Sequence, residues 1–212
     1  MPGPRDFNTT NHAGAAFAGA GLSCRRGDRL VFTHLDFSLV PGGLILLRGP
    51  NGSGKSSLLR LMAGLLPPAD GRLFWNGETL DPDRHRRRVA FLSHLDALKP
   101  ALSAAENLAF WCGPGAVGPA LAAYRIEHLA RRPARFLSLG QRRRLALARI
   151  FASGAPLWLL DEPGNGLDDE AEALFRGALA QHRENGGMAA IALHGESDLP
   201  DATTLSLASF TA

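Results

Sequence analysis

One short segment, residues 49–56, limits what this chain can fold into more than any other. It reads GPNGSGKS and follows the continuous apolar run at residues 44–47, which is typical of a buried parallel strand. From Lys55 onward, leucine and methionine recur at helical spacing until Pro67 stops the pattern. A strand that leads through glycines directly into a helix is the arrangement of a phosphate-binding loop. The order predicts an α/β fold.

Each part of this loop has its own chemical reason. Glycines let backbone N–H groups converge on phosphate oxygens, and the helix N-terminus adds partial positive charge. Lys55 can reach the β- and γ-phosphates, Ser56 is the expected magnesium ligand, and Ser57 lies nearer the α-phosphate. The predicted nucleotide-binding residues here are Gly49, Pro50, Asn51, Gly52, Ser53, Gly54, Lys55, Ser56 and Ser57. A glycine-rich turn that binds nothing is the alternative.

A second buried strand ends in two carboxylates. The apolar run at residues 157–160 is followed by Asp161 and Glu162, and ligands of open α/β sheets bind at the carboxyl ends of strands. Because successive strand side chains point to opposite faces, the two carboxylates can act separately. Asp161 can hold magnesium, directly or through water, while Glu162 in the bend can polarise an attacking water. A solvated turn is the alternative.

Further segments extend an alternating pattern of strands and helices around a largely parallel sheet. Strands are predicted at residues 30–40, 88–93, 188–192 and 203–207. Helices are predicted at residues 103–111, 121–129, 138–152 and 168–182. Before residue 22 the chain is rich in glycine, alanine, proline and asparagine without apolar periodicity. We therefore expect a flexible segment at residues 1–21 and a single domain at residues 22–212.

The composition excludes several classes of protein. Lysine and arginine number 23 against 20 aspartates and glutamates, and this net charge of +3 does not indicate nucleic-acid binding. The arginine clusters at residues 84–88 and 142–144 are interpreted as solvated faces. Cys24 and Cys112 stand alone, so neither a zinc site nor a disulfide framework is expected. Glycine–proline pairs interrupt the longest uncharged stretch, residues 107–124, which therefore cannot form a membrane helix.

Residues 137–141 read LSLGQ and begin the arginine-rich helix. A serine and a glycine at a helix start offer a hydroxyl and bare N–H groups to an anion, although a serine N-cap without a ligand is the simpler interpretation. Taken in order with residues 49–56 and 161–162, this segment resembles the signature motif of ABC-type ATPases. The resemblance covers about residues 22–209. It implies a P-loop NTPase fold with a RecA-like core, an antiparallel β subdomain and a small helical subdomain at about residues 103–152.

The same resemblance implies roles for single residues and the cofactors ATP and Mg²⁺. The signature residues would contact ATP held by a second copy of the chain in a head-to-tail dimer; they are Ser138, Gly140 and Gln141. Asp161 matches the Walker B aspartate and Glu162 the catalytic glutamate. Residues 165–168 (NGLD) match the D-loop, in which Asp168 contributes to nucleotide binding. His194 matches the switch histidine that contacts the γ-phosphate.

Three positions depart from the family pattern. Leu139 stands where the signature has glycine, so we expect nucleotide contact to survive with altered packing. His94 stands near the position of a glutamine that links magnesium to the membrane partner, and it is assigned here as a metal ligand whose charge depends on pH. Adenine usually stacks on an aromatic residue before the first strand, and the nearest match is Arg26, whose guanidinium can stack.

Residues 92–108 are most similar to the ATP-binding subunits of the cytochrome c maturation system, the CcmA family. The similarity rests on His94, on residues 98–100 (LKP) and on residues 106–108 (ENL). It implies a peripheral subunit at the cytoplasmic face of a bacterial inner membrane, paired with the permease CcmB and other cytochrome c maturation membrane proteins. Hydrolysis would energise haem export or haem release. An ABC ATPase for another exported cargo, a peptide or a lipid, is the alternative.

Overall fold

Two sheets form the framework of the computed structural model, which describes residues 14–193, 199 and 201–210. The first is a parallel sheet with the strand order β6-β7-β8-β3-β9. Its strands are β3 (Leu44–Arg48), β6 (Val89–Leu92), β7 (Leu157–Asp161), β8 (Met188–Ala192) and β9 (Thr203–Ser206). The second is antiparallel, with the order β2-β1-β4-β5. Its strands are β1 (Phe17–Arg26), β2 (Arg29–Leu39), β4 (Asp70–Trp75) and β5 (Glu78–Thr79).

The central strands β3, β7 and β8 of the parallel sheet are buried on both faces, which explains their continuous apolar sequences. Trp158 and Leu160 of β7 belong to one core cluster, whereas Leu157 and Leu159 belong to another. Successive side chains of a strand point to opposite faces, so alternate residues of β7 pack on opposite sides of the sheet. The first cluster includes residues of the helices that follow β6 and β7, and the second includes the helix after β3 and the antiparallel sheet.

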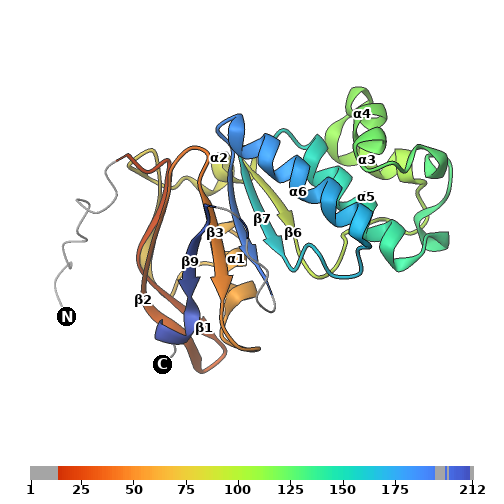
Figure 1. Cartoon of the computed structure of the whole chain (residues 1–212). Coiled ribbons are helices and arrows are strands. Elements are labelled where there is room, and N and C mark those ends of the chain that lie inside the picture. Colours follow the sequence, from red (N-terminus) through yellow and green to blue (C-terminus); the bar gives the residue numbers. More distant parts are fainter. Residues whose placement is uncertain (1–13, 194–198, 200, 211–212) are drawn as a thin grey trace.

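Helices cover these faces and extend the molecule to one side. The α-helices are α1 (Lys55–Met62), α2 (Pro82–Arg86), α3 (Ala104–Cys112), α4 (Val117–Ala123), α5 (Leu139–Ala152) and α6 (Asp169–Glu184). Short 3₁₀ turns lie at η2 (Pro114–Ala116), η3 (Glu127–Leu129), η4 (Ala134–Phe136) and η5 (Leu207–Phe210). Figure 1 shows α3 and α4 at the end of the molecule opposite β1 and β2, with α5 and α6 running beside β6 and β7. None of the helices in the described ranges is long and apolar enough to cross a bilayer.

Most predicted elements are confirmed, and so is the fold class. The strand expected at residues 30–40 is β2, the one at 88–93 is β6, and the long helix at 138–152 is α5 with Ser138 as its N-cap. An antiparallel sheet and a parallel sheet both occur, as the family resemblance implies.

Ordered structure begins earlier than the sequence predicts, because β1 starts at Phe17 within the segment expected to be flexible. Residues 18–21 are small and give no apolar periodicity. They form a strand because β2 and β4 pair with β1 from both sides. Small size is required at Gly19, since an added Cβ there would lie only 2.5 Å from the ring of Phe37 in β2. The strands β4 and β5 were also not predicted.

The helix predicted at residues 121–129 is wrong. α4 occupies residues Val117–Ala123 and ends before Arg125, whose φ of +53° interrupts any helix there. Only the 3₁₀ turn η3 follows. Pro119 lies in the first turn of α4, where a missing N–H costs nothing, so this proline does not delay the helix start.

Candidate functional site

The phosphate-binding segment forms a curved loop between β3 and α1. Gly49 and Gly54 have φ angles of +146° and +104°, which disfavour any residue with a Cβ. A Cβ at Gly49 would lie 2.7 Å from Ser53 Oγ, and one at Gly54 would lie 2.6 Å from Cγ1 of Val31 in β2. Both positions therefore require glycine, and the loop packs directly against β2.

This loop carries unsatisfied donors that fit a phosphate group. In the described part of the chain, no side chain caps α1 and no acidic residue lies in its first turn, so its N-terminal N–H groups and aligned dipoles face outward with partial positive charge. Ser53 Oγ is buried and has no hydrogen-bond partner among the described residues. A buried hydroxyl costs free energy until it is hydrogen-bonded. A phosphate oxygen at the loop would supply that bond.

Lys55 is positioned by the loop itself. Its side chain is buried, and Nζ donates hydrogen bonds to the carbonyl oxygens of Gly49 (2.7 Å) and Pro50 (3.2 Å). Because an ammonium has three donors, one is left for a phosphate oxygen. Ser56 is half-buried in the same turn, whereas Ser57 is buried. Lys55 and Ser56 are thus placed to meet a nucleotide, and nucleotide contact by Ser57 stays a prediction.

Asp161 lies on the side of the sheet that α1 covers. It is buried at the carboxyl end of β7, and Leu157 and Leu159 of the same strand share a core cluster with α1. Residues two positions apart in a strand share a face, so the carboxylate points toward the helix that Lys55 and Ser56 begin. A carboxylate and a hydroxyl oxygen are ligands that Mg²⁺ prefers. These two residues therefore fit a magnesium site.

Glu162 leaves the strand direction immediately after Asp161. Its φ is +51°, and its N–H donates to the carbonyl oxygen of Ala192 in β8 (3.0 Å). The Asn165 side-chain amide donates to Glu162 Oε2. Glu162 also lines a cavity of about 180 Å³ together with Phe175 of α6 and Leu193. The left-handed turn thus separates the two carboxylates, with Asp161 toward α1 and Glu162 beside α6.

A buried arginine contacts this turn, and the sequence analysis missed it. The cluster at residues 142–144 is interpreted above as a solvated face, which is wrong for Arg143, a side chain only 4% exposed. Its guanidinium donates to the carbonyl oxygens of Asp161 (3.1 Å) and Glu162 (2.5 Å). The helical period was the available signal, because Arg143 lies three and four positions before Ala146 and Leu147 on the buried face of α5.

The signature residues begin α5 with a capping box. Ser138 Oγ accepts from the N–H of Gln141 (3.2 Å), and Gln141 Oε1 accepts from the N–H of Ser138 (3.0 Å). Ser138, Gly140 and Gln141 also line a cavity of about 340 Å³ that includes Asp168. Among the described residues that line it, none belongs to the phosphate loop. The signature residues and the phosphate loop therefore form separate sites in one chain.

Leu139 lies fully at the surface of this region. It is 63% exposed, and its side chain covers Gly166 of the D-loop, where a Cβ would lie 3.6 Å from Leu139 Cδ2. Gly140 approaches the same loop, since its Cβ would lie 3.2 Å from the Gly166 carbonyl oxygen. The leucine in place of glycine is thus accommodated against the D-loop, with Gly140 still able to pack closely.

Asp168 has a structural task in this structure. Its Oδ1 accepts from the N–H of Ala171 (2.9 Å) as the N-cap of α6, and both oxygens accept from Arg144 (2.6 and 2.7 Å). The Ala171 N–H and then the Arg144 guanidinium lower the pKa of this carboxyl. Arg144 also binds Glu170 (3.1 Å), so the start of α6 is tied to α5. Nucleotide contact by Asp168 stays a prediction.

The remaining predicted residues lie around the site. His94 is exposed and follows β6, whose carboxyl end is next to that of β7, so it lies at the same edge as Asp161. Arg26 is exposed at the end of β1, in the hairpin leading into β2, which contacts the phosphate loop through Val31. His194 lies outside the described residues. Metal binding by His94 and base stacking by Arg26 stay predictions.

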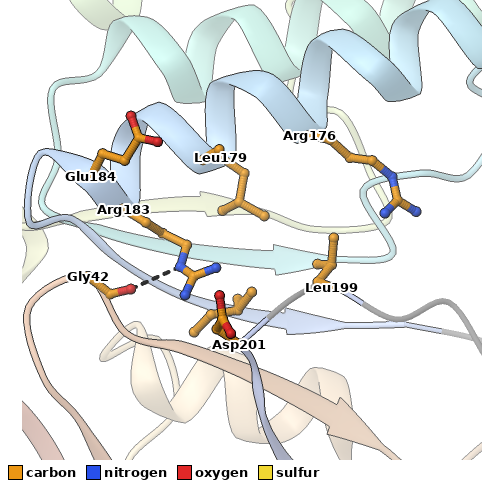
Figure 2. Close-up of a pocket in the computed structure, with 9 residues that line it drawn as sticks. Gly42, Arg176, Leu179, Arg183, Glu184, Leu199 and Asp201 are labelled. Carbon is orange, nitrogen blue, oxygen red and sulfur yellow. Dashed lines mark hydrogen bonds between the residues drawn. The ribbon is translucent and has the colours of Figure 1, made fainter.

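A larger cavity, of about 590 Å³, lies elsewhere, at the amino-terminal end of β3 and beneath α6. Figure 2 shows the Arg183 side chain reaching from α6 to Gly42, where Nε donates to the carbonyl oxygen (2.9 Å). Leu179 and Leu199 form apolar parts of its lining. Nucleotides bind at the carboxyl ends of parallel strands. This cavity lies at the opposite ends of the strands, so it is not the predicted nucleotide site despite its size.

Comparisons with known proteins agree with this geometry. A family profile described as ABC transporter matches residues 32–165. The chain is 49% identical to the cytochrome c biogenesis ATP-binding export protein CcmA of Rhodospirillum rubrum, over 98% of this chain and 92% of that protein. It is 47% identical to the protein of the same name from Paramagnetospirillum magneticum, over 92% and 95% of the two chains.

A solved structure agrees at the level of the fold. It is an ATP-binding cassette, described as a dimer in a post-hydrolysis state with ADP and Pi, that is 24% identical to this chain. The TM-score is 0.75, and the match covers 84% of this chain and 88% of that one. The family profile and the two sequence relatives establish the family, in agreement with the phosphate loop, the Asp161–Glu162 strand end and the signature helix. The chain belongs to the ABC transporter family as an ATP-binding and ATP-hydrolysing subunit, within the group of cytochrome c biogenesis ATP-binding export proteins.

Proposed function

We propose that the phosphate loop binds MgATP and that each polar residue around it has one task. Lys55 donates to the β- and γ-phosphates, and the Ser53 hydroxyl and the N-terminus of α1 complete the anion site. Ser56 and Asp161 hold Mg²⁺, which when bound offsets charge on the phosphates. The observation that carries this assignment is that Asp161 lies on the α1 side of the sheet, facing the turn of Lys55 and Ser56.

Glu162 acts as the general base in hydrolysis. Its carboxylate accepts a proton from water while the water oxygen forms a bond to the γ-phosphorus, and the bond between that phosphorus and ADP breaks. His194 contacts the γ-phosphate, in line with the family resemblance. Arg26 packs against the base, and His94 joins the magnesium site.

Two copies of the chain enclose the nucleotides. Ser138, Gly140 and Gln141 line a cavity apart from the phosphate loop, which supports a head-to-tail dimer in which these residues contact ATP bound to the second copy. The N-terminus of the long helix α5 favours such an anion. Asp168 holds the neighbouring D-loop in place for this contact.

The end of α3 docks on a membrane permease subunit, CcmB, and on other cytochrome c maturation membrane proteins. Phe110 and Trp111 are 58% and 49% exposed, and their rings meet edge to face at 5.2 Å. Exposed aromatic pairs of this kind are common anchors of protein interfaces. In Figure 1, α3 lies at the end of the molecule away from the antiparallel sheet, where it is accessible to a partner. This partner holds the chain at the cytoplasmic face of the bacterial inner membrane.

The assembled complex serves c-type cytochrome biogenesis, and hydrolysis energises haem export or haem release. The test is a chromosomal Glu162→Gln substitution in the source bacterium, followed by haem staining and difference spectra of membranes. We expect loss of the c-type cytochromes while b-type signals persist. A Glu78→Gln strain, which changes an exposed residue of β5, is the control. Unchanged c-type cytochromes would overturn the assignment and indicate another cargo, a peptide or a lipid.

A further inference from the structure

Arg143 reaches from α5 to two chain segments at the active edge of the parallel sheet. Nε donates to the carbonyl oxygen of Pro163 (3.2 Å), and Nη2 donates to those of Asp161 (3.1 Å) and Glu162 (2.5 Å). Nη1 donates to the carbonyl oxygen of Ser93 (3.2 Å) and to Asp96 Oδ1 (3.1 Å). A guanidinium has five N–H donors. All five therefore have an acceptor, and each acceptor belongs to a segment outside α5.

These acceptors lie on either side of the residues assigned to chemistry. Three carbonyls, at the last residue of β7 and the two residues after it, are those of Glu162 and its two chain neighbours, and the other two acceptors follow β6 and flank His94. Because the guanidinium is planar and rigid, five simultaneous hydrogen bonds fix the two segments relative to each other and to α5. A lysine could reach only part of this set, since it has three donors and no fixed plane.

Glu162 needs such support more than its neighbours do. Its φ of +51° is a conformation that residues with a Cβ rarely adopt, and it persists only where the surroundings hold it. Three backbone contacts do so: its N–H donates to the carbonyl oxygen of Ala192 in β8, and its own carbonyl oxygen accepts from Arg143 and from the Asn165 N–H (3.2 Å). Removing Arg143 takes away the contact that comes from α5.

The rest of α5 strengthens the same connection. Arg149, two turns further along, is also buried, donates to the carbonyl oxygen of Phe91 in β6 (3.1 Å) and stacks on Trp111 (5.2 Å). An apolar side chain would pack a helix on a sheet without the cost of burying a charge. Here the buried charges contact carbonyl oxygens at the strand end next to the chemistry.

From this geometry we propose that Arg143 is a positioning residue for hydrolysis, which keeps Glu162 in its left-handed turn and links that turn to the signature helix and the His94 segment. The inference rests on the proposed role of Glu162 as the base. Through Arg143, a displacement of α5 changes the position of Glu162, so contact between the signature residues and ATP affects the base.

The test compares purified Arg143→Lys and Arg143→Gln variants with wild type, by ATP titration and steady-state hydrolysis, with kcat referred to the concentration of nucleotide-binding sites. We expect ATP affinity within about threefold of wild type and kcat lower by roughly tenfold to a hundredfold, as for a displaced catalytic group. Lysine should not rescue kcat. Arg142→Lys and Arg142→Gln are the matched controls on the same helix. Normal kcat per binding site in Arg143→Lys would overturn the proposal.

A second pair of measurements separates positioning from general loss of structure. Asp96→Asn keeps an acceptor for Nη1 but removes its charge, and we expect a smaller fall in kcat with a normal unfolding midpoint. In a Glu162→Gln background, Arg143→Lys should lower the residual rate no further, because both changes remove the same function. A kcat of the double variant that is lowered by the product of the two single-variant reductions would contradict the proposal. Full turnover in Glu162→Gln alone would instead refute the role of Glu162.

Discussion

The curved phosphate loop depends on Gly49, where an added Cβ would lie 2.7 Å from Ser53 Oγ. We expect Gly49→Ala to weaken ATP binding by about tenfold, since strained backbone costs about 1–3 kcal/mol and 1.4 kcal/mol is one factor of ten. The loop would have to open to relieve the collision, and its donors would then separate. Titration with a fluorescent ATP analogue measures the effect.

Gly77 offers a matched control for this prediction. It also has a positive φ, of +80°, but a Cβ there would meet no atom within 4 Å. Gly77→Ala therefore adds backbone strain in the turn between β4 and β5 without changing the phosphate loop. Its ATP affinity should equal that of wild type, and equal affinities for all three proteins would contradict the account of Gly49.

Among the elements, α6 is attached to the sheet through a half-buried histidine. The His182 ring stacks on Trp158 in β7 at 4.0 Å, and its Nε2 lies 3.1 Å from the carbonyl oxygen of Met188. Burial lowers the pKa of His182, and it lowers the pKa of His85 beneath β1 in the same direction. Burial therefore favours the neutral form of both rings in the folded protein.

The sign of the resulting pH dependence follows from linkage. As pH falls below about 6.5, the unfolded chain binds protons at these histidines before the folded chain does, so the free energy of unfolding decreases with falling pH. We expect a lower urea midpoint at pH 5.5 than at pH 7.5. His182→Phe keeps a ring on Trp158 but cannot titrate, so its midpoint should fall less. If the urea midpoint of His182→Phe falls as much as that of wild type or more, His182 is not a source of the pH dependence.

Elements were predictable where neighbouring residues carry the signal. The strand at residues 188–192 is a continuous apolar run, and a sheet buried on both faces needs such strands. β1 was missed because its small residues form a strand only between β2 and β4, and such pairing does not appear in local periodicity. The phosphate loop and the paired carboxylates were predictable for the same reason, since each is a run of adjacent residues. Arg143 was not, because its acceptors lie 18 to 50 positions away in the chain.

At the scale of the whole molecule, the separation of the signature cavity from the phosphate loop predicts a nucleotide-dependent dimer. Glu162→Gln protein should be a monomer without nucleotide and a dimer with MgATP, because slow hydrolysis preserves the ATP that both copies contact. Light scattering during size-exclusion chromatography distinguishes the two states. Ser138→Tyr, which fills the signature cavity, should remain a monomer under the same conditions. A monomer in both states for Glu162→Gln would contradict the dimer.

Glu162 activates the attacking water, and the steady-state ATPase rate of purified Glu162→Gln measures that role. This substitution removes the base but leaves the side-chain volume and the hydrogen bonds of the Glu162 backbone unchanged. The account predicts ATP affinity close to that of wild type with kcat lower by roughly 10² or more, the scale of a positioned base. A kcat within a factor of about two of wild type would contradict it.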